Sequence, residues 1–172
     1  MKFRLLDKDD IEVRVQSVKE TGAVLLLYKN ARVDMNILDE TVGAENWQRE
    51  HYECKGNLFC RVGVNTNYAS PEKPDRWIWK SDCGTESMTE AQKGESSDSF
   101  KRACFNIGIG RELYTSPFIW VTADKCNIKS GKCYDRFSVE KIKYIEDGKK
   151  IVALAIWNDT KNARAYVWQE GK

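Results

Sequence analysis

Three extended runs follow one another between residues 46 and 84, and no other feature constrains the fold as strongly. The "KGN" turn at residues 55–57 joins the first two runs, as in a β-hairpin. A loop at residues 65–75, which holds two of the three prolines, separates the second run from "RWIWKS". A "DCG" turn at residues 82–84 closes this third run. The pattern predicts an antiparallel meander of three strands.

Two segments with helical periodicity flank the expected meander. The first spans residues 30–43, where Asn30 can cap the helix and Gly43 can end it. The second runs from about Glu86 to Ile107. Apolar side chains share one face of each expected helix, namely Val33, Ile37, Leu38 and Val42 in the first, and Phe100, Ala103, Cys104 and Ile107 in the second.

Further extended runs lie towards both ends of the chain. Residues 11–18 alternate apolar and polar side chains, which is typical of a half-buried strand, and residues 23–28 form a second short run. Residues 117–123 are extended, residues 123–135 are polar and irregular, and residues 136–168 predict two hairpins. The expected class is α+β: an antiparallel β-meander packed on a long helix, with an additional N-terminal strand and helix and C-terminal β-hairpins.

Composition narrows the classes of function. The 28 basic and 26 acidic residues nearly cancel, so any surface that binds nucleic acid must be a local one. The longest apolar runs are too short to span a bilayer, which predicts a cytoplasmic protein without membrane contact. Six cysteines with a single histidine and no Cys-x-x-Cys predict reduced thiols, with Cys60 and Cys104 in the core. A zinc site built from thiolates is the alternative.

Motifs for nucleotide chemistry are absent from the sequence. The "GIGREL" segment follows a helix rather than a strand, so Gly108 and Gly110 fit the end of a helix better than a dinucleotide site. No Gly-x-x-x-x-Gly-Lys-Ser/Thr occurs, which argues against ATP-driven chemistry and predicts no cofactor. A metal-dependent nuclease remains an alternative, because Lys80, Asp82 and Glu86 lie around one turn.

The second expected helix carries a cationic stripe in addition to its apolar face. Lys93, Ser97 and Lys101 are spaced by four residues, Arg102 lies beside them, and Phe105 follows Lys101 by four. Cations and an aromatic ring on one face are typical of a surface that binds nucleic acid.

A solvated charged face is the alternative interpretation of the same helix. In that case Lys101 and Arg102 would pair with Asp98. The small residues at 94–99 leave room for close approach by a neighbouring element, a subunit or a sugar-phosphate backbone.

Three stretches resemble a known family. They are "YKNARVDMNILDETVGAENWQ" at 28–48, "WIWKSDCGTES" at 77–87 and "KGESSDSFKRACFNIGIGRELY" at 93–114. Together they resemble the Rad-fifty-two family of single-strand annealing proteins, in its phage and prophage (Sak-like) branch. The likeness covers about residues 28–120 and includes the pattern Ser/Thr-Asp-x-x-Lys-Arg-Ala.

The resemblance implies a β-β-β-α unit that assembles into homo-oligomeric rings with single-stranded DNA in a basic groove. By position, Lys101 and Arg102 match the Lys-Arg pair that lines this groove. Lys93 matches a basic position two turns earlier, and Arg32 matches an arginine of the first helix within one residue. Phe105 stands where the family has a further basic residue, so its ring is expected to pack against sugar or base.

The resemblance also implies a function. We expect ATP-independent binding of single-stranded DNA and annealing of complementary strands in homologous recombination and double-strand-break repair, without enzymatic chemistry. Residues 1–172 are expected to form a single annealing-type domain, with a core at 28–120 and a C-terminal extension at 121–172. Other recombination proteins or a single-strand-binding protein are candidate partners in the bacterial host cell. A metal-dependent nuclease and a passive binder of single strands are the alternatives.

Overall fold

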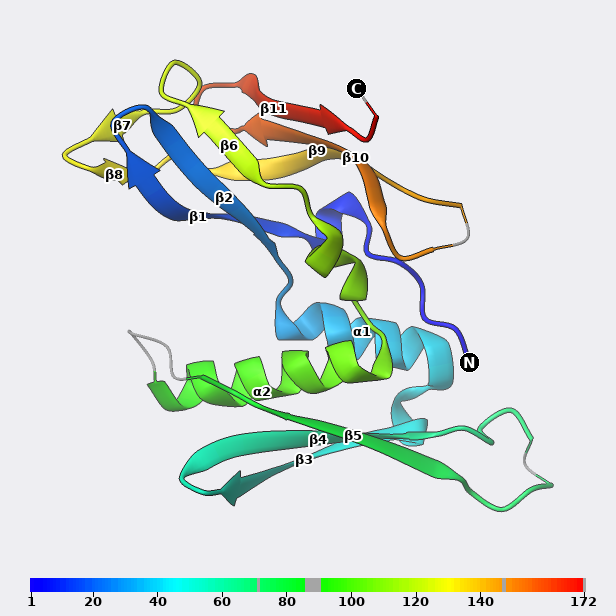
Figure 1. Ribbon diagram of the computed structural model, residues 1–172. Coiled ribbons are helices and arrows are strands. Elements are labelled where there is room, and N and C mark those ends of the chain that lie inside the picture. The colour runs from blue at the N-terminus through cyan, green and yellow to red at the C-terminus, as the bar shows by residue number, and fades with distance from the viewer. Residues whose placement is uncertain (71, 86–90, 147, 172) are drawn as a thin grey trace. The chain divides into compact units, whose positions relative to one another are not determined.

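The computed structural model describes residues 1–70, 72–85, 91–146 and 148–171, without the side chains of residues 91–93. The chain divides into two compact units, each built from two stretches of sequence. Unit 1 comprises Met1–Arg4 with Asn30–Gly110, and unit 2 comprises Leu5–Lys29 with Arg111–Lys172. Two α-helices and antiparallel sheets make up the described chain (Figure 1). The mixed class with antiparallel sheets is therefore confirmed.

Unit 1 contains a three-stranded antiparallel sheet. Its strands are, in spatial order, β3 (Trp47–Cys54), β4 (Asn57–Asn65) and β5 (Trp77–Cys83). Lys55 and Gly56 form the turn between β3 and β4, with φ of 54° and 75°. Positive φ at both positions defines a type I′ turn, whose twist matches that of the strands. The turn thereby sets the register in which Cys54 pairs with Asn57.

The first helix, α1 (Ala31–Val42), begins and ends at the residues that the sequence predicts. The Asn30 side-chain oxygen accepts hydrogen bonds from the amides of Arg32 and Val33, at 2.9 and 3.3 Å. Gly43 ends the helix with φ of 84°, a conformation that favours glycine. The predicted apolar face is buried. A short 3₁₀ turn (Ala44–Asn46) then leads into β3.

The second helix, α2 (Ala91–Ile107), buries most of the predicted apolar face, while Ile107 is only half-buried. Phe100, Ala103 and Cys104 are fully enclosed. The amides of Gly108 and Ile109 both donate to the Cys104 carbonyl oxygen, at 3.1 and 3.0 Å. The Gly-x-Gly sequence therefore ends the helix, as predicted. The predicted start at Glu86 lies outside the described residues.

Both helices of unit 1 lie on the same side of the three-stranded sheet (Figure 1). Asn106 of α2 donates to the Ser81 carbonyl oxygen of β5 at 3.0 Å, and the Glu95 carboxylate accepts from the Leu58 amide of β4 at 2.9 Å. The end of β5 approaches α2 so closely that a Cβ on Gly84 would fall 2.2 Å from the Glu95 carbonyl oxygen. A neighbouring element of the same unit therefore occupies part of the space beside the small residues of α2.

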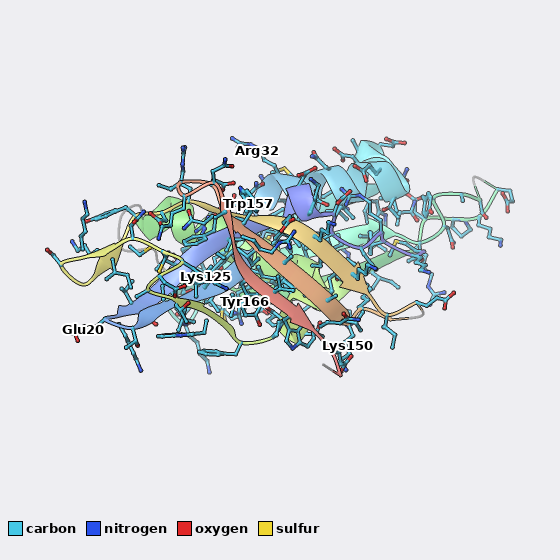
Figure 2. All side chains as sticks on the ribbon, turned by 90° about the horizontal axis from the view of Figure 1, so that it is seen from above. Glu20, Arg32, Lys125, Lys150, Trp157 and Tyr166 are labelled. Atoms are coloured by element: carbon cyan, nitrogen blue, oxygen red, sulfur yellow. The ribbon has the colours of Figure 1, made fainter. Side chains whose placement is uncertain are left out.

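Unit 2 contains a six-stranded antiparallel sheet. Its strands are, in spatial order, β11 (Ala163–Gln169), β10 (Ile151–Asn158), β9 (Phe137–Tyr144), β1 (Glu12–Lys19), β2 (Gly22–Tyr28) and β6 (Ile119–Thr122). Figure 2 shows the side chains of this unit, with Trp157 on β10 and Tyr166 on β11. The C-terminal strands join the N-terminal strands because Glu12 of β1 pairs with Ser138 of β9. The sequence predicts the C-terminal hairpins but not this pairing.

Shorter elements complete unit 2. The strands β7 (Ile128–Lys129) and β8 (Lys132–Cys133) form a small hairpin inside the segment that the sequence predicts to be irregular, and 3₁₀ turns lie at Lys8–Asp10 and Arg111–Thr115. All six cysteines of the chain have free thiols, and Cys60 and Cys104 lie in the core as expected. Among the helices in the described ranges, none is both long and apolar enough to cross a membrane.

Candidate nucleic-acid interface

Lys101 and Arg102 of α2 each lie next to a carboxylate. The Lys101 ammonium is 3.8 Å from the Asp98 carboxylate one turn earlier, and only 21% of the Lys101 side chain is exposed. The Arg102 guanidinium is 3.3 Å from the Asp82 carboxylate of β5. The solvated-face interpretation is therefore correct about the pairing of Lys101, while Arg102 pairs across to the neighbouring strand instead.

Both carboxylates are held in place by further hydrogen bonds. Asp98 accepts from the amide and the hydroxyl of Thr85, at 3.2 and 3.1 Å. Asp82 accepts from the Asn106 side-chain amide at 3.2 Å. The Lys101-Arg102 pair is consequently offset by two fixed negative charges, and a phosphate that binds there must compete with both of them.

A cleft of about 410 Å³ lies near the other half of α2. We call it the arginine cleft; its lining residues are Asn30, Ala31, Arg32 and Met35 from the start of α1, Arg49 from β3, and Ser96 and Ser97 from α2. This lining contains two cations and no acidic side chain. Neither Arg32 nor Arg49 forms an ion pair within the described part of the chain, and both are exposed. Figure 2 shows Arg32 at the start of α1.

The Arg49 side chain packs on an aromatic ring of α2. The guanidinium carbon of Arg49 lies 4.7 Å from the centre of the Phe100 ring, and Phe100 in turn stacks on Trp47 with ring centres 6.1 Å apart. Arg49 pairs across the sheet with Val62, a fully buried residue on the face towards α2. The strand therefore directs Arg49 to the helix side of the sheet, beside the serines of α2.

Small side chains keep the arginine cleft open. Ser97 turns its hydroxyl back to the Gly94 carbonyl oxygen at 3.2 Å. Ser96 is close enough to the His51 ring for a hydrogen bond at 3.1 Å. Both serines are thus tied down locally, and they are the residues of α2 that line the cleft in the described part of the chain.

The structure treats the five predicted site residues differently. Arg32 lines the arginine cleft. Lys101 and Arg102 lie outside it and pair with carboxylates. The Lys93 side chain lies outside the described residues, and Phe105 is half-buried. Sequence reasoning missed Arg49. The run "WQREHYEC" is mostly polar and lacks a regular apolar alternation that would mark which side chains of β3 face α2.

The opposite face of the three-stranded sheet carries aromatic rings. Tyr52 stacks on Phe59 with ring centres 5.5 Å apart, and Trp77 stacks on Trp79 at 6.2 Å. The Arg61 guanidinium lies 4.8 Å from the Trp79 ring centre. Arg61 alternates with the buried residues of β4, so this second stacked arginine points away from α2. It provides an internal comparison for Arg49.

The described residues bear on the two alternatives from the sequence, a metal site and a nuclease cluster. No group of three or more histidine, cysteine, aspartate or glutamate side chains that could hold a metal ion occurs there. Of the proposed nuclease cluster, Asp82 pairs with Arg102, and Glu86 lies outside the described residues.

An α+β unit that presents lysine and arginine side chains along one helix is typical of a protein that binds a polyanion. The chain matches the model of the Rad52/22 family of double-strand break repair proteins over residues 4–132, most of its length. It therefore belongs to the Rad52/22 family, and its role lies in DNA recombination and repair. No curated protein and no solved structure matches the chain significantly.

Proposed function

We propose that the protein binds single-stranded DNA without ATP and anneals complementary strands during homologous recombination and double-strand-break repair. Membership of the Rad52/22 family carries this proposal, together with the cations along α2 and the start of α1. Lys101 and Arg102 contact phosphates, Lys93 and Arg32 support them, and Phe105 packs against sugar or base. The protein would act in the cytoplasm of a bacterial host as a phage- or prophage-encoded member of the Sak-like branch.

The physical requirements of annealing agree with this role. Annealing needs no hydrolysis, so the absence of a P-loop from the sequence is consistent with it. Contacts to phosphates hold a strand without reading its sequence and leave the base edges available for pairing. Binding through phosphates also needs no base-specific pocket.

Assembly into a homo-oligomer, expected to be a ring, is the second part of the proposal. A chain with a net charge of only +2 forms a strongly basic groove if each subunit adds one copy of the same helix. Among the described residues of unit 1, β3 and β5 each have one edge without a partner strand, which would give adjacent subunits a surface for joining. The whole chain is proposed to act as one annealing-type domain with a β-β-β-α core.

Replacing both Lys101 and Arg102 by alanine tests the phosphate contacts. The double variant is expected to stay folded but to lose most of its affinity for a single-stranded oligonucleotide. The slope of log affinity against log salt should become shallower by about 0.7 for each phosphate that the variant no longer binds. A Lys129→Ala, Lys132→Ala variant is the matched control, because it removes two exposed lysines from unit 2. Equal binding by both variants and the wild type would show that the groove assignment is wrong.

Annealing itself needs a separate assay. Two complementary oligonucleotides labelled with a donor and an acceptor dye should pair faster with the protein than without it, in the presence of EDTA. Binding without acceleration would identify a passive binder instead. Cleavage products that form only with magnesium or manganese would identify the nuclease. Negative-stain images with and without oligonucleotide test for rings.

A further inference from the structure

We propose that the arginine cleft is a subsite for a backbone phosphate of single-stranded DNA, and that Arg49 is its main ligand. The inference rests on the proposed function and adds to it a residue that lies on β3, outside both helices. Arg32 is the second ligand of the same subsite. The occupant is a phosphodiester group, which both guanidinium groups recognise by charge and by hydrogen bonding.

Charge is the first argument for the arginine cleft. Lys101 and Arg102 face the fixed carboxylates of Asp98 and Asp82, at 3.8 and 3.3 Å. Arg32 and Arg49 form no ion pair with any residue in the described ranges, and no acidic side chain lines the cleft. A phosphate that enters the cleft therefore does not have to displace a described carboxylate, and it gains the attraction of two positive charges.

Preorganisation is the second argument. The Arg49 guanidinium lies over the ring of Phe100, with its carbon 4.7 Å from the ring centre, and Phe100 is fully buried and stacks on Trp47. Stacking occupies the flat face of the group but leaves its N–H donors at the edge available for phosphate oxygens. Because the ring already orders the side chain, less conformational entropy is lost when a phosphate binds.

Space is the third argument. The cleft measures about 410 Å³ and is lined on the α2 side by Ser96 and Ser97 rather than by long side chains. Asn30 already accepts the first amides of α1, so the arginine side chains and not the helix end hold the anion. Ser97 and Lys101 are four residues apart on α2, a rise of about 6 Å. A strand that contacts Lys101 can therefore continue along the same helix face into the cleft.

Arg49→Gln is the principal test, read by fluorescence anisotropy with a labelled oligothymidylate over a range of salt concentrations. We expect affinity at low salt to fall about tenfold, as for the loss of a charge-assisted hydrogen bond, and the salt slope to become shallower by about 0.7. Arg49→Lys keeps the charge but not the planar fork, so it should retain the slope and recover part of the affinity.

Arg61→Gln is the matched control. It removes an arginine from the next strand of the same sheet, one that also packs on an aromatic ring. Arg61 points away from α2 and, unlike Arg49 among the described residues, pairs with a carboxylate, that of Glu50 at 2.6 Å. This variant should bind like the wild type. Melting temperatures of both variants separate binding from folding. If Arg49→Gln does not fold, Arg32→Gln at an exposed position of α1 takes its place, with the same expected direction.

The possible results show whether the subsite proposal fails alone or together with the proposed function. If Arg49→Gln and Arg32→Gln bind like Arg61→Gln while the Lys101, Arg102 double variant loses binding, the arginine cleft is not a subsite and the proposed function stands. Equal losses for Arg49→Gln and Arg61→Gln would also overturn the subsite, because the effect would then not depend on the face of the sheet. If the wild-type protein binds no single-stranded DNA, both proposals fail.

Discussion

Asp98 offers the sharpest test of the idea that carboxylates restrain the cations of α2. Its carboxylate lies 3.8 Å from the Lys101 ammonium, and it also accepts hydrogen bonds from Thr85. Asp98→Asn removes the negative charge but keeps a side-chain oxygen for Thr85. The substitution should therefore release Lys101 for a phosphate without detaching the end of β5 from α2.

The expected gain follows from the exposure of the pair. At about 4 Å two charges attract by about 1 kcal/mol in water and by about 4 kcal/mol near a protein surface. The Lys101 and Asp98 side chains are 21% and 31% exposed, and measured pairs with partial exposure contribute about 1 kcal/mol at most. We therefore expect Asp98→Asn to bind single-stranded DNA about fivefold more tightly at low salt. Screening should reduce this gain at high salt.

Anisotropy titrations of Asp98→Asn at several salt concentrations provide the assay. Glu20→Gln is the control, because it changes the net charge by the same amount in the exposed turn between β1 and β2 (Figure 2). Glu20→Gln should leave the affinity nearly unchanged. Weaker binding by Asp98→Asn than by the wild type would refute the reasoning, since it would mean that Asp98 holds Lys101 in its binding position instead of competing with DNA.

Two further predictions concern stability. Gly63→Ala should lower the free energy of unfolding by about 1–3 kcal/mol, measured by urea denaturation, because a Cβ there would lie 2.8 Å from the Trp79 ring; an unchanged midpoint would contradict the packing. Burial raises the pKa of the Asp135 carboxyl, but hydrogen bonds from Asn158 and Asn127 outweigh burial and hold the pKa below its usual value. Asp135 therefore contributes stability above its unfolded pKa of about 3.9, and the contribution is lost as the pH falls through the lower folded pKa. In Asn158→Ala the folded pKa should rise towards the unfolded value, so less stability should be lost as the pH falls from 7 to 3. Identical melting-temperature profiles for the variant and the wild type over this range would count against the network.

Local signals explain why parts of unit 1 are predictable from the sequence. The bounds of α1 follow from Asn30 and Gly43, whose effects act within a few residues. The turn at Lys55 and Gly56 likewise depends only on residues that tolerate positive φ. The ion pair between Asp98 and Lys101 was foreseeable for the same reason, since the two residues are three apart on one helix.

Long-range packing explains what the sequence did not reveal. In the six-stranded sheet, Glu12 of β1 pairs with Ser138 of β9. The sequence pattern of each strand predicts the strand itself but does not indicate which strand it pairs with. Asp82 reaches Arg102 only because β5 packs against α2. Arg49 was missed because β3 has no regular apolar alternation. Only its pairing with the buried Val62 shows that the Arg49 side chain lies on the face of the sheet that α2 covers.

The two kinds of cation in unit 1 would perform different tasks in the proposed function. Arg32 and Arg49 line a cleft without acidic side chains, so they would hold a phosphate most firmly. Lys101 and Arg102 must each leave a carboxylate to bind a phosphate, so their contacts would form and break more readily than those in the cleft. Annealing requires a strand that stays bound while its register shifts against a complement. A firm anchor next to weaker, exchangeable contacts along one helix would meet both requirements, which uniformly strong contacts would not.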